Sequence, residues 1–413
     1  MPQVAIIGGG VVGMTTAYAL VRNGHSVTVI EPHEGPAREA SYANGGQLSY
    51  RYVAPLADAG VPLKALGWML KGDDAPLKFR PRLSPTQWRW SLSFLAACRR
   101  SVNQRNGAHL LRLSLFSQKV LQEWREQDGL DGFAWQRNGK LVIYRKPESF
   151  ERAASGIDPE DERRVLTPAA CVEHEPALSA IKDQIVGGVL SPSDEAGDCR
   201  LFCEALEQRL LESGRYRRLR DRVVAFEHGS GRVQGITLES GEVLRPDDTV
   251  LAAGNASAAL ARKLAIELPL YPLKGYSLTV PAGDGCPSVS VTDFDNKVVY
   301  ARLGEHLRVA AMVDIGATDT RVSPARMAAL KALCRHTFPT AGDYDNAQEW
   351  AGQRPSTPEG PPVLGTTRFA NLWLNVGHGS LGFTLSCASA AVLAHLIDRR
   401  PSPISLDGLT LSH

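Results

Sequence analysis

The N-terminal 31 residues carry the pattern that most restricts what this chain can fold into. An apolar run at residues 2–7 leads into a glycine-rich turn at residues 8–13, and a helical stretch follows. A second apolar run, at residues 27–30, ends in the carboxylate of Glu31. This order predicts a β-α-β unit that holds a dinucleotide, because the turn and the helix start form a phosphate site.

Each part of this unit has a physical role in the predicted site. Gly8 permits the tight turn, Gly10 lets the backbone approach a pyrophosphate, and Gly13 lets the helix pack closely on the strand. Backbone N–H groups at the helix start, including those of Val11 and Val12, are expected to face the phosphates. Glu31 is expected to accept hydrogen bonds from ribose hydroxyls, which argues against NADP. The motif by itself does not separate FAD from NAD.

Composition limits the class of protein. A length of 413 residues predicts two domains, and a net charge of +2 gives no reason to expect a nucleic-acid partner. The seven cysteines form no CxxC pair and show no metal-ligand spacing, so we expect no metal site and reduced thiols.

The order of the expected elements predicts a discontinuous arrangement. Elements of the nucleotide-binding type lie at the start, in the middle and at the end of the chain. We therefore expect a nucleotide-binding domain from residues 1–85, 195–262 and 345–413. A substrate-binding domain is expected from residues 86–194 and 263–344.

One stretch bears on membrane contact. Residues 61–71 are short and amphipathic, and residues 88–100 combine aromatic and aliphatic side chains with two terminal arginines. Such segments can lie in a lipid interface, although packing of these helices on the protein is the favoured interpretation. The N-terminal apolar run lacks a basic leader and predicts a strand. No continuous apolar window approaches the roughly 20 residues that a spanning helix needs.

Seven motifs, in this order, resemble one family nearly end to end. The chain is similar to the FAD-dependent D-amino acid oxidase superfamily and, within it, to the bacterial D-amino acid dehydrogenases. The motifs are IIGGGVVG (6–13), SYANGGQ (41–47), GVPLKA (60–65), DEAGDC (194–199), YPLKGYS (271–277), GQRPSTPEG (352–360) and GHGSLGFT (377–384).

The resemblance implies FAD as the cofactor, and it implies an α/β fold. One part would be an FAD-binding Rossmann-type domain of the glutathione-reductase-like class. The other would be an α+β substrate domain with a mixed or antiparallel sheet. It also assigns cofactor contacts beyond the β-α-β unit to Ser41, Asn44, Gly45, Gly46, Gln47, Val224, Ala253, Gly254, Gly352, Gly377, His378, Gly379, Ser380, Leu381, Gly382 and Thr384.

Arg354 is the side chain expected to bind the substrate. A planar guanidinium presents two parallel donors to a carboxylate, a geometry that lysine cannot reproduce. The resemblance places Tyr276 and Tyr52 where they would close the pocket, and His378 beside the flavin as a candidate functional group. Arg51 lies where relatives often carry small residues or proline. It would pair with an acidic substrate side chain, narrow the pocket or face water.

The expected reaction is oxidation of a D-amino acid, by hydride transfer from Cα to the flavin N5, to an imino acid that water hydrolyses. D-proline would give a cyclic imine. Electrons would pass to a quinone or another respiratory acceptor. The alternatives are a sarcosine- or glycine-oxidase-type enzyme that uses oxygen, and a non-catalytic flavoprotein subunit. The expected location is the cytoplasm, with peripheral contact at the inner face of the cell membrane.

Overall fold

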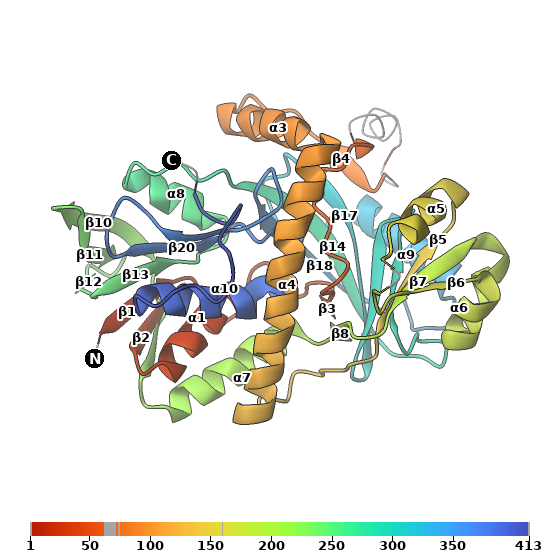
Figure 1. The fold of residues 1–413 in the computed structure, drawn as a ribbon, viewed down its shortest axis with the longest axis horizontal. Helices are drawn as coiled ribbons and strands as arrows, with labels where there is room; N and C mark the ends of the chain where they lie inside the picture. The colour runs from red at the N-terminus through yellow and green to blue at the C-terminus, as the bar shows by residue number, and fades with distance from the viewer. Residues whose placement is uncertain (1, 62–71, 73–74, 159, 412–413) are drawn as a thin grey trace.

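A computed structural model describes residues 2–61, 72, 75–158 and 160–411. Two large sheets organise these residues (Figure 1). Part of the amphipathic stretch at 61–71, and with it most of the GVPLKA motif, lies outside the described residues.

The first sheet is the nucleotide-binding one, with the order β19-β20-β13-β1-β2-β9. Its strands are parallel except β19, which runs antiparallel to β20. The predicted β-α-β unit at the N-terminus forms its centre. The strands are β1 (Gln3–Ile7), β2 (Ser26–Ile30), β9 (Tyr216–Leu219), β13 (Asp248–Leu251), β19 (Val363–Thr366) and β20 (Leu372–Val376).

Helices cover this sheet, and a small antiparallel sheet with the order β10-β11-β12 adjoins it. α10 packs between α1 and α4. Together with the preceding turn, it forms a span, Gly379–Ile397, that is long and apolar enough by composition to cross a membrane, but most of this span is buried inside the protein. These elements are α1 (Val11–Arg22), α4 (Arg100–Asp128), α7 (Cys199–Glu212), α8 (Ala256–Lys263), α10 (Gly382–Ile397), β10 (Val223–Gly229), β11 (Arg232–Leu238) and β12 (Val243–Leu244).

The second sheet is mixed and mostly antiparallel, as expected for the substrate domain. Its order is β18-β14-β17-β16-β15-β5-β7-β6, and β4 pairs with β17. The strands are β4 (Leu77–Phe79), β5 (Lys140–Tyr144), β6 (Arg164–Leu166), β7 (Gly187–Ser191), β14 (Tyr271–Pro281), β15 (Ser290–Asp293), β16 (Val298–Leu303), β17 (His306–Ile315) and β18 (Gln348–Ser356).

Short helices flank the second sheet, and a two-stranded pairing of β3 with β8 joins the two halves of the molecule. These elements are α3 (Pro85–Ala97), α5 (Pro147–Ser155), α6 (Pro168–His174), α9 (Pro324–Thr337), the 3₁₀ helices η1 (Pro176–Gln184) and η2 (Gly379–Leu381), β3 (Gln47–Leu48) and β8 (Glu195–Ala196).

The sheets divide the chain differently from the expected boundaries in three places. β18 lies within 345–413, yet it pairs with β14 of the second sheet along its whole length. β4 lies within 1–85, yet it pairs with β17 of the same sheet. α4 lies within 86–194, but its apolar face packs into the core of the first sheet through Val120, Leu121 and Trp124. The division therefore follows strand pairing and helix amphipathicity rather than sequence order.

Candidate active site

The glycine-rich turn has the close contacts that the sequence predicts. Gly8 has φ +111°, and a Cβ there would lie 2.6 Å from the carbonyl oxygen of Ala252. A Cβ on Gly13 would collide with the carbonyl oxygen of Gly8. α1 begins at Val11 without an acidic residue in its first turn, so the positive end of its dipole is left available for phosphates.

Glu31 is buried at the end of β2, with 7 % of its surface exposed. One carboxylate oxygen accepts from the Gly9 N–H at 2.7 Å and the other from the His33 N–H at 3.1 Å. A carboxylate has about four acceptor positions, so acceptor capacity remains for ribose hydroxyls. The Ser41 hydroxyl lies at the start of α1 and accepts the Val11 N–H at 3.1 Å.

Three more expected cofactor contacts, at two places in the chain, lie beside the first sheet. Val224 falls at a register shift between Val223 and Ala225, so the regular pairing of β10 with β11 is interrupted there. Ala253 and Gly254 follow β13, and Gly254 has φ +54° with open space where a Cβ would be. These features leave backbone surface free for a nucleotide.

Residues 43–52, called here the crossing segment, run over one face of the second sheet from β14 to β7. The Ser277 hydroxyl donates to the Ala43 carbonyl at 2.7 Å over β14. A Cβ on Gly45 would come within 3.0 Å of Val299 on β16. Farther along, the Lys140 ammonium on β5 donates to the Ser49 hydroxyl at 2.7 Å.

Three of the other predicted residues on this segment use their side chains or backbone to hold it. The Asn44 side chain accepts the Gly46 N–H at 3.1 Å. The Gln47 side chain donates to the carbonyl oxygens of Tyr300 at 3.1 Å and Val291 at 3.3 Å, and so points into the sheet. Its backbone carbonyl accepts from the Thr384 hydroxyl at 3.5 Å, which links the crossing segment to α10.

Arg354 lies on β18, and its guanidinium crosses the neighbouring strand. β14 and β18 pair Gly275 with Gly352 and Leu273 with Arg354. A Cβ on Gly275 would lie 2.6 Å from Cζ of Arg354, so only glycine leaves room for the crossing. Nη1 then reaches the Met312 carbonyl on β17 at 3.4 Å. Gly352, which is expected at the cofactor, lies in this sheet opposite Gly275.

The Arg354 guanidinium has no acidic partner among the described residues. Burial lowers the pKa of Arg354 to about 10, so the group remains cationic at neutral pH. A desolvated cation without an anion is costly unless a ligand supplies the charge. This arrangement fits the binding of a carboxylate.

A cavity of about 70 Å³ joins Arg354 to the C-terminal glycine loop. Gly377 and Gly379 have φ +85° and +57°, and His378 between them forms a β-bridge with Ser356. Burial lowers the pKa of His378 to about 3, and the neutral ring lies 3.1 Å from the Ser389 hydroxyl. Apolar, aromatic and polar side chains complete the wall, among them Ala54, Pro55, Leu56, Trp90, Phe94, Leu273, Val313, Ser380 and Leu381.

The structure separates the two predicted tyrosines from the substrate-binding position assigned to them. The Tyr276 hydroxyl donates to Asp314 at 3.0 Å, because its strand register turns it to the other face of the sheet from Arg354. Tyr52 lies in a second cavity over β5 and β7. Burial raises the pKa of both phenols. Arg51 pairs with Glu162 at 2.6 Å.

A set of residues that brace the crossing segment was not assigned a role from the sequence. The buried Arg308 on β17 donates to the Asn44 carbonyl at 2.9 Å and to Asp198 at 3.2 Å. Glu195 accepts from the Tyr50 hydroxyl at 3.1 Å, and Asp194 accepts the Tyr50 N–H at 2.9 Å. The acidic residues in the motif at 194–198 could have indicated these contacts, since acidic side chains that become buried need hydrogen-bond or charge partners.

The residues present fit FAD. The helix N-terminus, the buried Glu31 carboxylate and the open backbone at Gly254 suit its adenosine diphosphate part. The crossing segment contacts Thr384, which lies in α10 two residues beyond the loop at 377–382, and the flavin ring is expected there. The N-terminus of α10 would place positive dipole charge toward the pyrimidine edge.

Comparisons with known proteins agree with this fit. A family model described as "FAD dependent oxidoreductase" (DAO) matches residues 3–396. D-amino acid dehydrogenase 2 of Pseudomonas aeruginosa is 56 % identical over 98 % of this chain and 97 % of its own. D-amino acid dehydrogenase of Paramagnetospirillum magneticum is 42 % identical over the same shares.

Solved structures share the fold. Glycine oxidase from Geobacillus kaustophilus aligns with a TM-score of 0.77 over 100 % of this chain and 99 % of its own, at 22 % identity. L-proline dehydrogenase from P. horikoshii aligns with a TM-score of 0.76 over 99 % and 96 %, at 16 % identity. The family model and the two relatives show that this chain belongs to the DAO family of FAD-dependent oxidoreductases, with FAD as its cofactor.

Proposed function

We propose that this protein is an FAD-dependent D-amino acid dehydrogenase. The observation that carries the proposal is the Arg354 guanidinium, which lies over Gly275 without an acidic partner among the described residues. The two relatives named above, which match nearly full length, are D-amino acid dehydrogenases. The substrate is a D-α-amino acid. D-proline is included because Arg354 binds the carboxylate rather than the amine.

The residues of this chain bind and orient the substrate. Arg354 holds the carboxylate with two parallel donors, which fixes the position of Cα. Apolar side chains such as Leu273 and Val313 exclude water from the cavity. His378 is neutral, so it adds no second cation beside Arg354. FAD, when bound, supplies the acceptor for the hydride that leaves Cα.

The nucleotide-binding half is proposed to be of the glutathione-reductase-like class. The parallel order β20-β13-β1-β2-β9 and the adjoining three-stranded sheet β10-β11-β12 support this assignment. The electron acceptor is proposed to be a quinone or another respiratory carrier, as in the reaction expected from the sequence.

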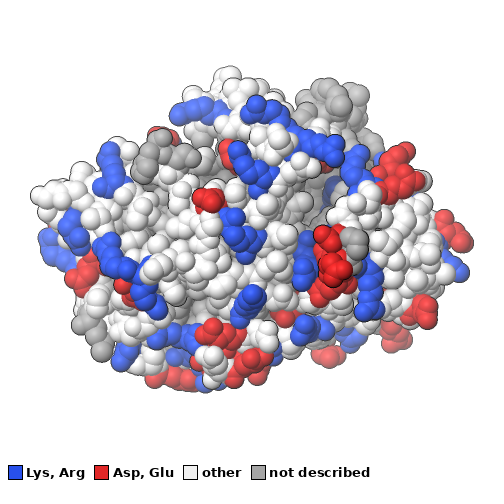
Figure 2. Space-filling view, in the orientation of Figure 1, with Lys and Arg blue, Asp and Glu red and all other residues white. Residues whose placement is uncertain are grey.

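The proposed location is the cytoplasm, with peripheral contact at the inner face of the membrane. Trp88, Leu92 and Leu95 on α3 are 47 %, 64 % and 50 % exposed, and Leu83 just before the helix is fully exposed. Figure 2 shows Lys and Arg side chains together at the top of the view, where Figure 1 places α3. Exposed apolar side chains beside cations suit an anionic lipid surface.

The test is an anaerobic screen of D- and L-amino acids against the yellow holoprotein. We expect D-amino acids to bleach the flavin absorbance and L-amino acids to leave it unchanged. Arg354→Ala should keep FAD bound but raise KM or abolish turnover. The control Arg321→Ala removes an arginine whose side chain is 89 % exposed and should behave as wild type.

The same preparation separates the dehydrogenase from an oxygen-using amine oxidase. Reduction of a quinone or dye is expected to outpace peroxide formation in air. Rapid stoichiometric peroxide would support the glycine-oxidase-type alternative. A flavin that no amino acid bleaches would contradict both enzymes.

A further inference from the structure

The second sheet carries another cavity, of about 210 Å³, at its end away from Arg354. Tyr52, Tyr144 and Phe294 form aromatic walls, and Val142 and Val189 form the apolar floor. The Tyr144 and Phe294 rings lie with centroids 5.0 Å apart. The space suits one substituted planar ring, which aromatic walls favour.

This cavity is separate from the one at Arg354. The two sets of lining residues share no member. Tyr52 lines this cavity, whereas Ala54, Pro55 and Leu56 farther along the chain line the other. The guanidinium reaches from β14 as far as β17, and β5 is three strands beyond β17, which corresponds to about 14 Å at the usual strand spacing. An amino acid held at Arg354 is too short to fill both.

The polar groups of this cavity are donors. Among the described residues that line it, none is acidic; the polar ones are Tyr52, Tyr144, Ser149, Arg152, Arg163 and Ser191. Ser149 already donates to Asp295, and Arg163 pairs with Asp161. The hydroxyls of Tyr52 and Tyr144 have no hydrogen-bond partner among the described residues. A ligand with carbonyl oxygens would satisfy them, whereas an amine would find no counter-charge.

The neighbourhood links the cavity to the cofactor region. The Lys140 ammonium lies 4.3 Å from the centroid of the Tyr52 ring and donates to Ser49 of the crossing segment. The same segment, through Gln47, contacts the start of α10. α5 lines the cavity through Ser149, Arg152 and Ala153, and Figure 1 places α5 in the upper half of the view, at the right, with α3 at the top. A ligand with a lipid tail would thus reach the cavity from the side proposed to contact the membrane.

We propose that this second cavity binds the ring of a quinone, which is the electron acceptor; this inference rests on the function proposed above. The ring packs against the aromatic side chains, and its carbonyl oxygens accept from Tyr52 and Tyr144. The quinone takes up two electrons and two protons and leaves as the hydroquinone. The electrons are those removed from the amino acid, and the protons come from solvent.

The test fills the cavity without touching the Arg354 site. Val189→Phe occupies the floor, and Tyr144→Phe removes one donor while it keeps the ring. The control Val165→Phe makes the same change on the neighbouring strand β6, where the side chain is 47 % exposed. The probe is decylbenzoquinone, and the readouts are calorimetric binding to the holoprotein and the KM for the quinone.

We expect Val189→Phe to weaken quinone binding about tenfold or more, equal to about 1.4 kcal/mol. Tyr144→Phe should weaken binding by roughly threefold to tenfold, the effect of one hydrogen bond. Anaerobic bleaching of the flavin by a D-amino acid should be unchanged in all three variants. If Val189→Phe does not fold, the quinone affinity of Tyr144→Phe decides whether the proposal holds.

Unchanged quinone affinity in the folded cavity variants would overturn the proposal. Phenylpyruvate, a 2-oxo acid with an aromatic ring, is a second probe. If the cavity variants lose phenylpyruvate binding but retain quinone binding, the proposal is also overturned, since the cavity would then bind a 2-oxo acid. Failure of the proposed function gives a different result, because the wild-type flavin would then resist bleaching by every D-amino acid. A wild-type protein that is bleached normally but does not bind the quinone would refute this inference alone.

Discussion

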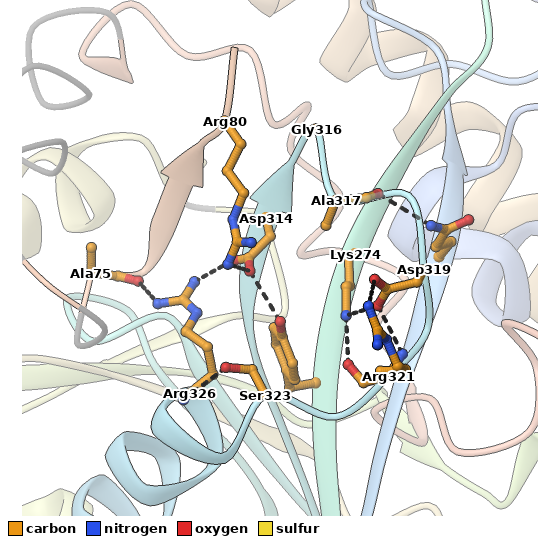
Figure 3. Close-up of polar contacts among 12 residues, drawn as sticks. Ala75, Arg80, Lys274, Asp314, Gly316, Ala317, Asp319, Arg321, Ser323 and Arg326 are labelled. Atoms are coloured by element: carbon orange, nitrogen blue, oxygen red, sulfur yellow. Dashed lines mark hydrogen bonds and ion pairs between the residues drawn. The ribbon is translucent and has the colours of Figure 1, made fainter. Parts of the chain in front are cut away.

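Two buried arginines at one end of the second sheet differ in whether an acidic side chain balances their charge. Arg326 and Asp314 are both fully buried and pair at 2.6 Å. Figure 3 shows the Arg326 guanidinium between Asp314 and the Ala75 carbonyl, with Arg80 on the other side of the carboxylate. Among the described residues, the Arg354 guanidinium has a hydrogen-bond partner only in the Met312 carbonyl, at 3.4 Å.

The contrast distinguishes a buried charge that stabilises the fold from a buried charge that is kept for binding a ligand. A buried ion pair with satisfied hydrogen bonds holds segments together, whereas a desolvated ion without a partner is retained for a ligand. Asp314 joins α9, β17 and, through the Tyr276 hydroxyl, β14. Arg354 holds nothing comparable in place. The four predictions that follow test this difference.

The largest expected effect is on the paired region. Asp314→Ala should lower the free energy of unfolding by about 3–5 kcal/mol, because it leaves the Arg326 charge buried and uncompensated. Urea unfolding of the holoprotein measures this change. The control Asp345→Ala removes an ion pair with Arg335 in which Asp345 is 82 % exposed, and it should change stability by less than about 1 kcal/mol. Equal losses of unfolding free energy in both variants would show that burial does not make the Asp314–Arg326 pair more important for stability than an exposed pair.

An unpaired acid extends the comparison to pH. Asp194 has one carboxylate oxygen that accepts the Tyr50 N–H and another that is buried and has no geometrically regular hydrogen bond among the described residues. Burial raises its pKa to about 6. The folded state therefore binds this proton more tightly than the unfolded state, and stability should fall as pH rises from about 4 to about 6.

Asp194→Asn should remove this pH-dependent contribution, which amounts to up to about 3 kcal/mol. The measurement is the free energy of unfolding between about pH 4 and about pH 8, taken as wild type minus variant. Asp131→Asn, at a side chain that is 70 % exposed, is the control. A difference that stays flat with pH would mean that Asp194 is not desolvated.

The β-α-β unit shows how much of the fold was predictable. Its strand, turn and helix are neighbours in sequence, so the spacing of glycines and apolar residues determines their contacts. The structure places β1, the helix start at Val11 and the Glu31 carboxylate in that order. The mixed second sheet was also expected, but the boundaries at 85 and 345 were not reliable, because β4 and β18 pair with distant strands.

The details of the site depend on strand register, which the sequence does not encode locally. Arg354 was chosen for its guanidinium chemistry, but the need for Gly275 beneath it appears only when β14 and β18 are aligned. Tyr276 was expected at the substrate, yet a register irregularity beside it accompanies its contact with Asp314. A shift of one residue turns a side chain to the opposite face of a strand.

Gly275 provides the third prediction, about the unpaired region itself. Gly275→Ala adds a methyl group where the guanidinium crosses β14, so Arg354 must move away from its present position. We expect kcat/KM for the D-amino acid to fall about tenfold to a hundredfold, with FAD still bound. Gly72→Ala, at a glycine whose Cβ position has no atom of the described residues within 4 Å, is the matched control. Wild-type kinetics in Gly275→Ala would mean that the guanidinium position is unimportant.

The smallest expected effect is on stability at Arg354. Arg354→Met keeps an unbranched side chain of similar length and removes a desolvated cation that has no acidic partner. The free energy of unfolding should therefore change by less than about 1 kcal/mol, or rise, in contrast to the loss expected for Asp314→Ala. Stabilisation by a bound D-amino acid, measured as a shift in Tm, should disappear in the variant because the carboxylate no longer has its partner. If Arg354→Met instead unfolded as readily as Asp314→Ala, the guanidinium would be part of the structural framework, and the substrate carboxylate would have to bind elsewhere.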